Sequence, residues 1–391
     1  MKKILYLSLV DWFWIKQRPH HIPEILSKNN KVSYFCSKPW RNNNYLKNSH
    51  SRDQAHFKDT HFMINENLEV YRKRFFPHKK FNKFIDPIYR TAKSVSDAYI
   101  KRFLELLDDQ KKFDILFVTH PNQIDFIPKK IVDNTFVIYD CMDNFKKFQP
   151  RYENDIIQKE RELLKICDVV TVSSSKLYKE IEKYNINNIK KKIFIINNGV
   201  DIERFNPNIS EEESDITFFR NNDNKKVAYI GTVDKWVDLE LIKKIAKNNK
   251  NIDFYIIGPI SRHISIDNYK EAENIIFTGV QPYDTIPYIL KKIDVSIMPF
   301  IKNELVESVN PVKIYESLAL GKPVIATRYQ ETDKFGEYIY TYENIEEFQN
   351  ILLSLINKKE NPDIIQKRID FAMANSWEKR VNEIESLWMN P

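Results

Sequence analysis

Four residues near position 310 combine the groups that a phosphate-bearing ligand needs. Asn310 and Pro311 come directly before a predicted helix that carries Lys313 and Glu316. Because helical side chains three positions apart share a face, the lysine and the glutamate should lie side by side. Proline suits a first helical turn, where a missing N–H costs nothing. Free N–H groups, a cation and a carboxylate at a helix start suit a nucleotide diphosphate, with the ribose on the carboxylate.

The residues around Lys313 and Glu316 indicate whether the pair belongs to a ligand-binding site or is an ordinary solvent-exposed ion pair. A Lys–Glu pair at this spacing is common as a solvated pair of little energetic weight. Here the residues that follow are apolar, at 318–320 and in a predicted strand at 323–326, so the helix should dock on a sheet. Ligands bind along the carboxyl edge of open α/β sheets. The pattern therefore favours a sugar-nucleotide enzyme.

Length and composition bound the fold. The chain has 391 residues, 42% hydrophobic and 13% aromatic, which is enough for two folded domains. Its apolar runs are too short to cross a membrane, and the run that Asp11 interrupts indicates a first strand rather than a signal peptide. Cys36, Cys141 and Cys167 are few and widely spaced, so we expect reduced thiols in a cytoplasmic protein without a metal site. A net charge of +7 does not demand nucleic acid, and we expect none as a partner.

The glycines indicate which half binds the nucleotide. None precedes Gly199, so the first half has no Gly-rich phosphate loop. Gly231, Gly258, Gly279 and Gly321 all end or adjoin predicted strands of the second half. We therefore expect the nucleotide on the second half, which disfavours an NAD-dependent dehydrogenase, the main rival for a doubly wound fold.

Short apolar strands alternate with amphipathic helices along the chain. This alternation predicts parallel sheets with helices on both faces. Strands are predicted at 4–10, 32–36, 115–119, 136–140, 169–173 and 193–196, and again at 227–231, 253–257, 275–277, 295–298 and 324–326. A polar segment at 206–226 separates the halves, and a last helix is predicted at 376–388. Two similar halves indicate two Rossmann-like domains facing a cleft.

Three segments carry a family resemblance. They are DWFWIKQRPHH at 11–21, NNGVDIERF at 197–205 and NPVKIYESLALGKPVIAT at 310–327. Lesser matches are IGTVDKWVD at 230–238, IGP at 257–259 and FTG at 277–279. Together, and in this order over nearly the whole chain, they resemble the GT-B glycosyltransferases, in particular bacterial enzymes of teichuronic acid and other surface-polysaccharide synthesis.

The resemblance implies an α/β protein of the GT-B fold. Its parts would be an N-terminal acceptor-binding domain over 1–205, a linker over 206–226, a nucleotide-sugar domain over 227–370, and a C-terminal helix over 371–391 that packs back on the first domain. It implies a UDP-sugar or other nucleotide-sugar donor, a glycan or lipid-linked glycan acceptor, and no metal ion or cofactor. The expected location is the cytoplasm, at the inner face of the plasma membrane.

The resemblance also implies a set of donor-binding residues. The diphosphate would contact Lys313, nearby amides and the loop after Gly231, and the base would contact the loops after the next two strands. The full set is Gly231, Asp234, Lys235, Gly258, Pro259, Gly279, Val280, Ser308, Val309, Asn310, Pro311, Val312, Lys313 and Glu316.

The chain departs from the family at one position. Many retaining members carry two glutamates eight residues apart, the second corresponding to Glu316, but the earlier position here is Ser308. The stereochemical outcome therefore stays open. An inverting enzyme needs a general base from its first domain. The candidates are Asp143, in the loop YDCMDNF, and then Asp140; Asp143 could equally cap a helix.

Gln17, Arg18, His20 and His120 are the candidate acceptor or cleft residues. Arg18 could reach phosphate or acceptor, whereas one of the histidines at 20 and 21 would only begin a helix. The segment YRKRFFPHKKFNKF at 71–84 mixes six basic residues with aromatics, which suits an anionic membrane surface. A nucleic-acid groove or a solvated loop has the same composition.

Two other functions fit the same architecture. One is a nucleotide-sugar epimerase, which needs no acceptor. The other is a non-catalytic nucleotide-sugar-binding protein. The segment at 310–316 resembles the transferases better than the epimerases, so transfer is the function we expect.

Overall fold

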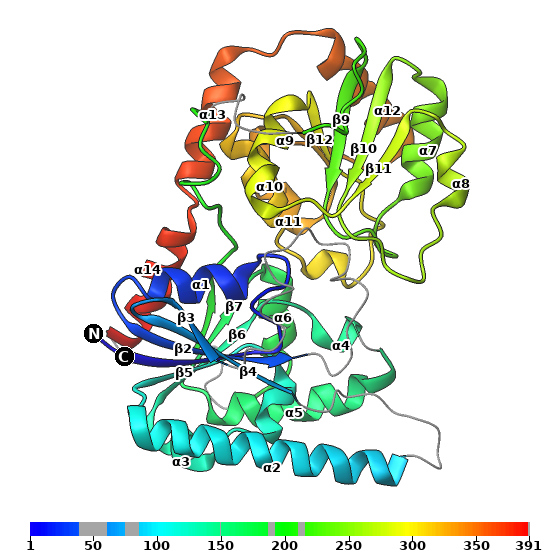
Figure 1. The fold of residues 1–391 in the computed structure, drawn as a ribbon. Coiled ribbons are helices and arrows are strands. Elements are labelled where there is room, and N and C mark those ends of the chain that lie inside the picture. Colours follow the sequence, from blue (N-terminus) through cyan, green and yellow to red (C-terminus); the bar gives the residue numbers. More distant parts are fainter. Residues whose placement is uncertain (39–60, 75–85, 149, 187–191, 210–215, 390–391) are drawn as a thin grey trace. The chain divides into compact units, whose positions relative to one another are not determined.

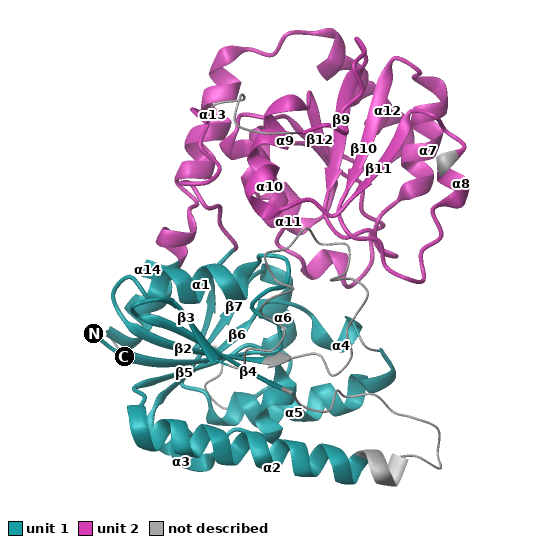
Figure 2. Cartoon of the chain, viewed as in Figure 1, with its two compact units in different colours: residues 1–43, 52–197, 381–391 teal, residues 44–51, 198–380 magenta. Residues whose placement is uncertain are grey.

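The computed structural model describes residues 1–38, 61–74, 86–148, 150–186, 192–209 and 216–389. These residues form two compact units (Figure 2). Among the described residues, the first unit holds those up to Asn197 and those from Val381 on, and the second holds those from Asn198 to Arg380. The units therefore divide before the predicted boundary at 205. The reason is that Asn198 is hydrogen-bonded to Asn310 inside the second unit.

The first unit is built on an eight-stranded sheet (Figure 1). The strands predicted in the first half are all present, with ends that differ by one or two residues, and β3 and β4 were not predicted. The sheet is parallel except where β3 pairs with β4. Its strands, in spatial order, are β3 (His61–Asn65), β4 (Leu68–Arg74), β2 (Lys31–Lys38), β1 (Lys3–Ser8), β5 (Ile115–Val118), β6 (Phe136–Cys141), β7 (Val169–Val172) and β8 (Ile193–Ile195).

Helices bury both faces of this sheet, which explains why its central strands are apolar throughout. Leu104 of α2 and Leu163 of α5 belong to one core cluster, and Ile22 of α1 and Ile384 of α14 belong to another. From Val381 on, the last helix therefore packs in the first unit, as predicted. The helices are α1 (Arg18–Leu26), α2 (Asp86–Lys111), α3 (Lys129–Asn134), α4 (Phe145–Phe148), α5 (Glu153–Ile166), α6 (Ser175–Glu182) and α14 (Trp377–Met389).

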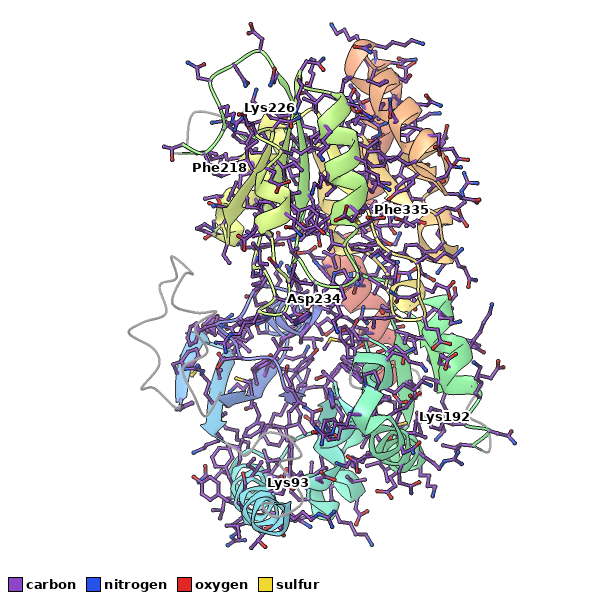
Figure 3. All side chains as sticks on the ribbon, turned by 90° about the vertical axis from the view of Figure 1, so that its right-hand side faces the viewer. Lys93, Lys192, Phe218, Lys226, Asp234 and Phe335 are labelled. Atoms are coloured by element: carbon purple, nitrogen blue, oxygen red, sulfur yellow. The ribbon has the colours of Figure 1, made fainter. Side chains whose placement is uncertain are left out.

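The second unit is built on a six-stranded parallel sheet in the order β11-β10-β9-β12-β13-β14. The strand order reverses between β9 and β12, and such a switch point opens a ligand crevice at the carboxyl ends of the strands. In Figure 3, Lys226 at the start of β9 and Asp234 in the loop after it mark opposite ends of this sheet. The strands are β9 (Lys225–Ile230), β10 (Ile252–Ile257), β11 (Ile275–Gly279), β12 (Val295–Met298), β13 (Val324–Thr327) and β14 (Tyr340–Tyr342), of which β14 was not predicted.

Two core clusters cover the two faces of the second sheet. Ile242 of α7 and Phe348 of α12 lie in one cluster, and Ile289 of α9 and Leu318 of α10 lie in the other. The helix that was expected to bind the diphosphate, α10, is thus docked on the sheet. The helices are α7 (Leu239–Asn248), α8 (Asp267–Lys270), α9 (Ile286–Lys292), α10 (Val312–Ala319), α11 (Gln330–Asp333), α12 (Ile345–Asn357) and α13 (Pro362–Met373).

The predicted linker at 206–226 belongs to the second unit. Phe219 packs edge-on against Tyr255, with ring centroids 4.7 Å apart, and the backbone N–H of Arg220 donates to the phenol of Tyr255 at 3.0 Å. Residues 210–215 of this segment lie outside the described residues. The polar composition of this segment did not indicate these contacts, by which it attaches to β10.

The basic segment at 71–84 is only partly the surface segment that was predicted. Tyr71 lies within β4, and Arg72 is 1% exposed with its guanidinium 2.6 Å from the carboxylate of Asp11. Pairing with Asp11 compensates the burial of this charge, a contact that composition does not reveal. Residues 75–85 lie outside the described residues. Among the helices that the structure describes, none has the length and apolarity needed to cross a bilayer.

Candidate active site

The start of α10 places a buried carboxylate beside a cation. Helix α10 begins at Val312, after the N-cap Pro311, and Leu318 and Ala319 anchor it in the core. The ammonium of Lys313 lies 2.7 Å from Oε2 of Glu316; the lysine is 30% exposed and the glutamate 1%. The pair thus shares a face as predicted, but its carboxylate is buried rather than solvated. No side chain caps the start of α10, because Pro311 has no side-chain acceptor; the N–H of Ile314 donates to the backbone oxygen of Pro311 at 3.2 Å.

Tyr283 is a third member of this cluster, and sequence reasoning missed it. It lies just after β11, in the loop predicted to contact the base, and its phenol donates to Oε1 of Glu316 at 3.2 Å. The ammonium of Lys313 lies 5.5 Å from the centre of its ring. Burial, and then the charge of Glu316, raise the pKa of the Tyr283 phenol well above its usual value. No periodic signal links residues 283 and 316, because they meet only through the fold.

The loop before α10 is held from within. Asn310 is buried; its side-chain oxygen accepts from the backbone N–H of Asn198 at 2.8 Å, and its backbone oxygen accepts from the Asn198 side chain at 2.7 Å. Its amide donates to the carboxylate of buried Glu331 at 3.2 Å. Ser308 donates to the backbone oxygen of Leu305 at 2.6 Å. The predicted donor residues Ser308 and Asn310 therefore use these side-chain atoms to shape the loop, because each is buried beside an acceptor or donor of the chain itself.

Three glycine-containing loops end β9, β10 and β11 side by side. The N–H of Gly258 donates to the oxygen of Gly279, and the N–H of Gly231 donates to the oxygen of Ile257, both at 2.9 Å. Gly258 has a φ of +141°, and a Cβ there would lie 2.1 Å from the oxygen of Gly231. Only glycine allows this close approach. Pro259 and Val280 are partly buried beside these glycines.

The loop after β9 is tied to the loop after β10. The carboxylate of Asp234 lies 2.8 Å from Nε2 of His263 and accepts a hydrogen bond from Ser261. Burial opposes the shift, but the hydrogen bonds from Ser261 and from the backbone N–H of Lys235 lower the pKa of Asp234. Asp234, predicted to bind the donor, therefore positions this loop. The side chain of Lys235 is exposed.

In the first unit, Arg18 and Asp140 form a buried ion pair instead of facing a ligand. Asp140 is 0% exposed, lies 2.7 Å from the guanidinium of Arg18 and accepts from the Thr171 hydroxyl at 2.6 Å. Arg18 also donates to the backbone oxygen of Ile196 at 2.9 Å. We therefore correct two expectations. Arg18 does not extend to phosphate or acceptor, and Asp140 does not fit a general base, because each charge is consumed by its internal partners.

Asp143 remains a candidate for the general base. It lies in the loop that follows β6 and is partly buried. Burial raises the pKa of Asp143 to about 7; the nearby Arg18 acts against this shift and Asp140 adds to it. A carboxyl with this pKa exchanges protons near neutral pH, where a general base is most effective.

Of the histidines predicted near the acceptor, His20 is structural. Its Nδ1 accepts from the backbone N–H of Gln17 at 3.2 Å, and its Nε2 lies 3.2 Å from the oxygen of Asp11. Burial lowers the pKa of His20 to about 4, so its ring is neutral. Together with Gln17, the N-cap residue, it caps α1. This corrects the expectation that His20 contacts the acceptor, whereas the partly exposed Gln17 stays a candidate.

His120 lies at the same sheet edge as the loop of Asp143. It follows β5, the neighbour of β6, and its ring centre lies 4.2 Å from that of Phe145. Its Nδ1 accepts from the backbone N–H of Asn122 at 3.0 Å. This bond caps a short 3-10 helix (Pro121–Asp125), so His120 orients the chain beside the loop of Asp143.

Known proteins resemble this chain both in its second unit and over its whole length. Residues 224–358 match the family described as Glycosyl transferases group 1. This match includes the three glycine loops and the start of α10. A curated relative, named "Putative teichuronic acid biosynthesis glycosyltransferase TuaH", from Bacillus subtilis (strain 168), is 28% identical over 217 residues. That alignment covers 53% of this chain and 54% of the relative, so the chain spans about half the length of the curated protein it matches.

Solved structures of similar fold cover nearly the whole chain. Sucrose-phosphate synthase from Thermosynechococcus elongatus has a TM-score of 0.71 at 12% identity, over 100% of this chain and 98% of that one. Anabaena Alr3699/HepE, in complex with UDP and glucose, has a TM-score of 0.67 at 13% identity over 100% of both chains. Starch synthase IV of Arabidopsis thaliana, bound to ADP and acarbose, has a TM-score of 0.67 at 13% identity over 99% and 98%. At these identities the likeness concerns the fold. The chain therefore has the GT-B fold, and its residues 224–358 match the group 1 glycosyltransferase family.

Proposed function

We propose that the protein transfers a sugar from a nucleotide diphosphate donor, a UDP-sugar, to a hydroxyl of a glycan or lipid-linked glycan in surface-polysaccharide synthesis. One observation carries the proposal, namely the buried carboxylate of Glu316 beside Lys313 at the start of α10. The name of the B. subtilis relative supports the acceptor class. The UDP and UDP-glucose complexes of HepE support the choice of donor.

In this proposal the start of α10 binds the leaving group. The first N–H groups of the helix and the ammonium of Lys313 stabilise the two phosphates, whose negative charge grows as the sugar departs. The carboxylate of Glu316 accepts hydrogen bonds from ribose hydroxyls. Gly231, Gly258 and Gly279 have no side chains, so the donor can approach the backbone of these three loops closely.

The proposed general base is Asp143. It takes the proton of the acceptor hydroxyl while that oxygen bonds to the anomeric carbon, and the bond from this carbon to the diphosphate oxygen breaks with its electron pair going to the diphosphate. A pKa of about 7 leaves roughly half of the Asp143 carboxyls ionised at neutral pH. This single displacement inverts the anomeric carbon. Ser308 leaves retention open as the alternative, which would not need this base.

We propose that the reaction needs no divalent metal, because Lys313 and the helix N–H groups already face the leaving charge. We also propose that the enzyme works in the cytoplasm at the inner face of the plasma membrane, where lipid-linked glycans are extended. Within the basic segment at 71–84, only the part after Arg74 stays a candidate membrane contact. That part lies outside the described residues.

Calorimetric titration tests the donor site. Wild-type protein is titrated with UDP, GDP, ADP and their sugar conjugates, and then compared with Lys313→Ala. Hydrogen bonds to charged groups contribute roughly 1.5–3 kcal/mol, so the variant should bind the preferred nucleotide about 10–100-fold more weakly. A matched control is Lys358→Ala, which removes an exposed lysine at the far end of α12. Equal affinity of Lys313→Ala and wild type, or no binding of any nucleotide to wild type, would contradict the proposal.

A further inference from the structure

We infer that Tyr283 is a positioning residue that orients the Glu316 carboxylate toward the ribose of the donor. The inference rests on the proposed function and adds a residue from another loop. The phenol of Tyr283 donates to Oε1 of Glu316 at 3.2 Å. Tyr283 is separated from Glu316 by α9, β12 and the loop before α10, so the two meet only in the folded unit.

The two oxygens of Glu316 have different surroundings. Oε1 accepts from Tyr283, whereas buried Oε2 has the ammonium of Lys313, at 2.7 Å, as its partner among the described residues. A carboxylate oxygen can accept two hydrogen bonds, so Oε2 has unused capacity. Leaving a buried acceptor unsatisfied is costly. When the half-buried ammonium of Lys313 turns to the diphosphate, a ribose hydroxyl supplies the missing donor to Oε2.

The ring of Tyr283 is packed on several sides. The guanidinium of Arg204 lies 5.1 Å from its centre and the ammonium of Lys313 lies 5.5 Å from it. The ring of Phe205 meets it edge-on, with centroids 5.7 Å apart. Arg204 is itself ion-paired with Asp201 at 3.4 Å and with Asp284. An aromatic face attracts a nearby cation. These contacts therefore hold the Tyr283 ring in place and with it the position of the phenol hydroxyl.

This packing connects the NNGVDIERF segment to the donor site. Arg204 and Phe205 belong to that segment, and both contact the ring whose hydroxyl orients Glu316. The phenol stays protonated at working pH, because burial raises its pKa well above the usual value. It therefore acts as a constant donor to Oε1. The carboxylate is then held with Oε2 as the acceptor for the ligand.

The test measures how strongly the site distinguishes ribose from deoxyribose. The probe is whichever of UDP, GDP and ADP binds most tightly, together with its 2′-deoxy and 3′-deoxy forms. Wild type should prefer the ribonucleotide over at least one deoxy form about tenfold, the value of one hydrogen bond to a charged group. Tyr283→Phe keeps the ring but loses the hydroxyl, so its preference should fall below about threefold. The control Tyr342→Phe removes a buried phenol that is hydrogen-bonded to Thr327 in the same unit, and it should behave as wild type.

A second variant guards against loss of folding. Arg204→Met keeps the phenol but removes a cation from its ring, and it should reduce the ribose preference by about half. Thermal melting first establishes which variants fold. An unchanged preference in the folded variants would overturn the role of Tyr283, while a weakened Lys313→Ala would still support the donor site. Failure of wild type to bind any of the three nucleotides would instead overturn the proposed function.

Discussion

Replacing Asp143 by asparagine should make the protein more stable and inactive at the same time. Burial raises the pKa of Asp143 from an ordinary 3.8 to about 7, against the effect of Arg18 and with a contribution from Asp140. Since its pKa is higher in the folded than in the unfolded state, the folded protein binds more protons between these values. Its stability therefore falls as the pH rises from about 4 to about 7.

The difference between these pKa values sets an upper bound of about 4 kcal/mol on the cost of ionising Asp143 above pH 7. Because the side chain is partly exposed, solvent reduces this cost, and we expect about 2 kcal/mol. The asparagine side chain of the Asp143→Asn variant cannot ionise, so the variant does not have this cost. A gain of this size should raise the melting temperature by about 4–8 °C for a unit of roughly 200 residues.

Thermal melting of both proteins at pH 5, 6, 7 and 8 measures this gain. The difference between variant and wild type should grow from pH 5 to pH 7 and then level off. Asp140→Asn is the matched control, because it breaks a buried ion pair with Arg18 and should destabilise the protein by about 3–5 kcal/mol. A melting difference that does not change with pH would refute the raised pKa.

Activity assays test the other half of this prediction. Without the base, turnover should fall about 10²–10⁴-fold, while calorimetry should find nucleotide binding unchanged. In wild type, kcat/KM should rise about tenfold per pH unit below about 7. Near-normal turnover of Asp143→Asn would remove Asp143 as the base.

Two further predictions concern the donor side. Glu331→Ala removes the acceptor of the Asn310 amide and the partner of the Lys334 ammonium, which lies 2.7 Å from the Glu331 carboxylate. The free energy of unfolding of the second unit, measured with denaturant, should fall by about 1–3 kcal/mol, and nucleotide binding should weaken. Unchanged stability would show that the Asn310 loop does not depend on Glu331. Treatment with a chelator should leave transfer intact, because in the proposed function Lys313 and the α10 N–H groups bind the diphosphate. Loss of transfer that manganese restores would count against this.

Much of the fold was predictable because it depends on local patterns. Buried parallel strands appear in the sequence as short apolar runs, and the strands predicted on this basis in both units are present. The pairing of Lys313 with Glu316 was predictable for the same reason, since helical spacing alone brings them together. The glycine loops followed from their positions at strand ends.

What could not be predicted depends on contacts between distant residues. Arg18 and Asp140 each looked available for chemistry, but they are 122 residues apart and pair inside the core. The sequence of β4 resembled a basic surface segment, because nothing in it indicates that Arg72 pairs with Asp11, 61 residues earlier. Tyr283 had no signal at all, because a single tyrosine after a strand is an ordinary feature. Periodicity identifies elements, but it does not report which polar groups the fold will bring together.

The central claim is that the diphosphate of the donor rests at the start of α10, and a crystal structure with bound UDP tests it most directly. We expect phosphate oxygens at about 2.7–3.2 Å from the first backbone N–H groups of α10 and from the ammonium of Lys313. We also expect ribose hydroxyls on the carboxylate of Glu316. UDP bound elsewhere, with the ion pair of Lys313 and Glu316 intact and no phosphate at this helix end, would contradict the claim.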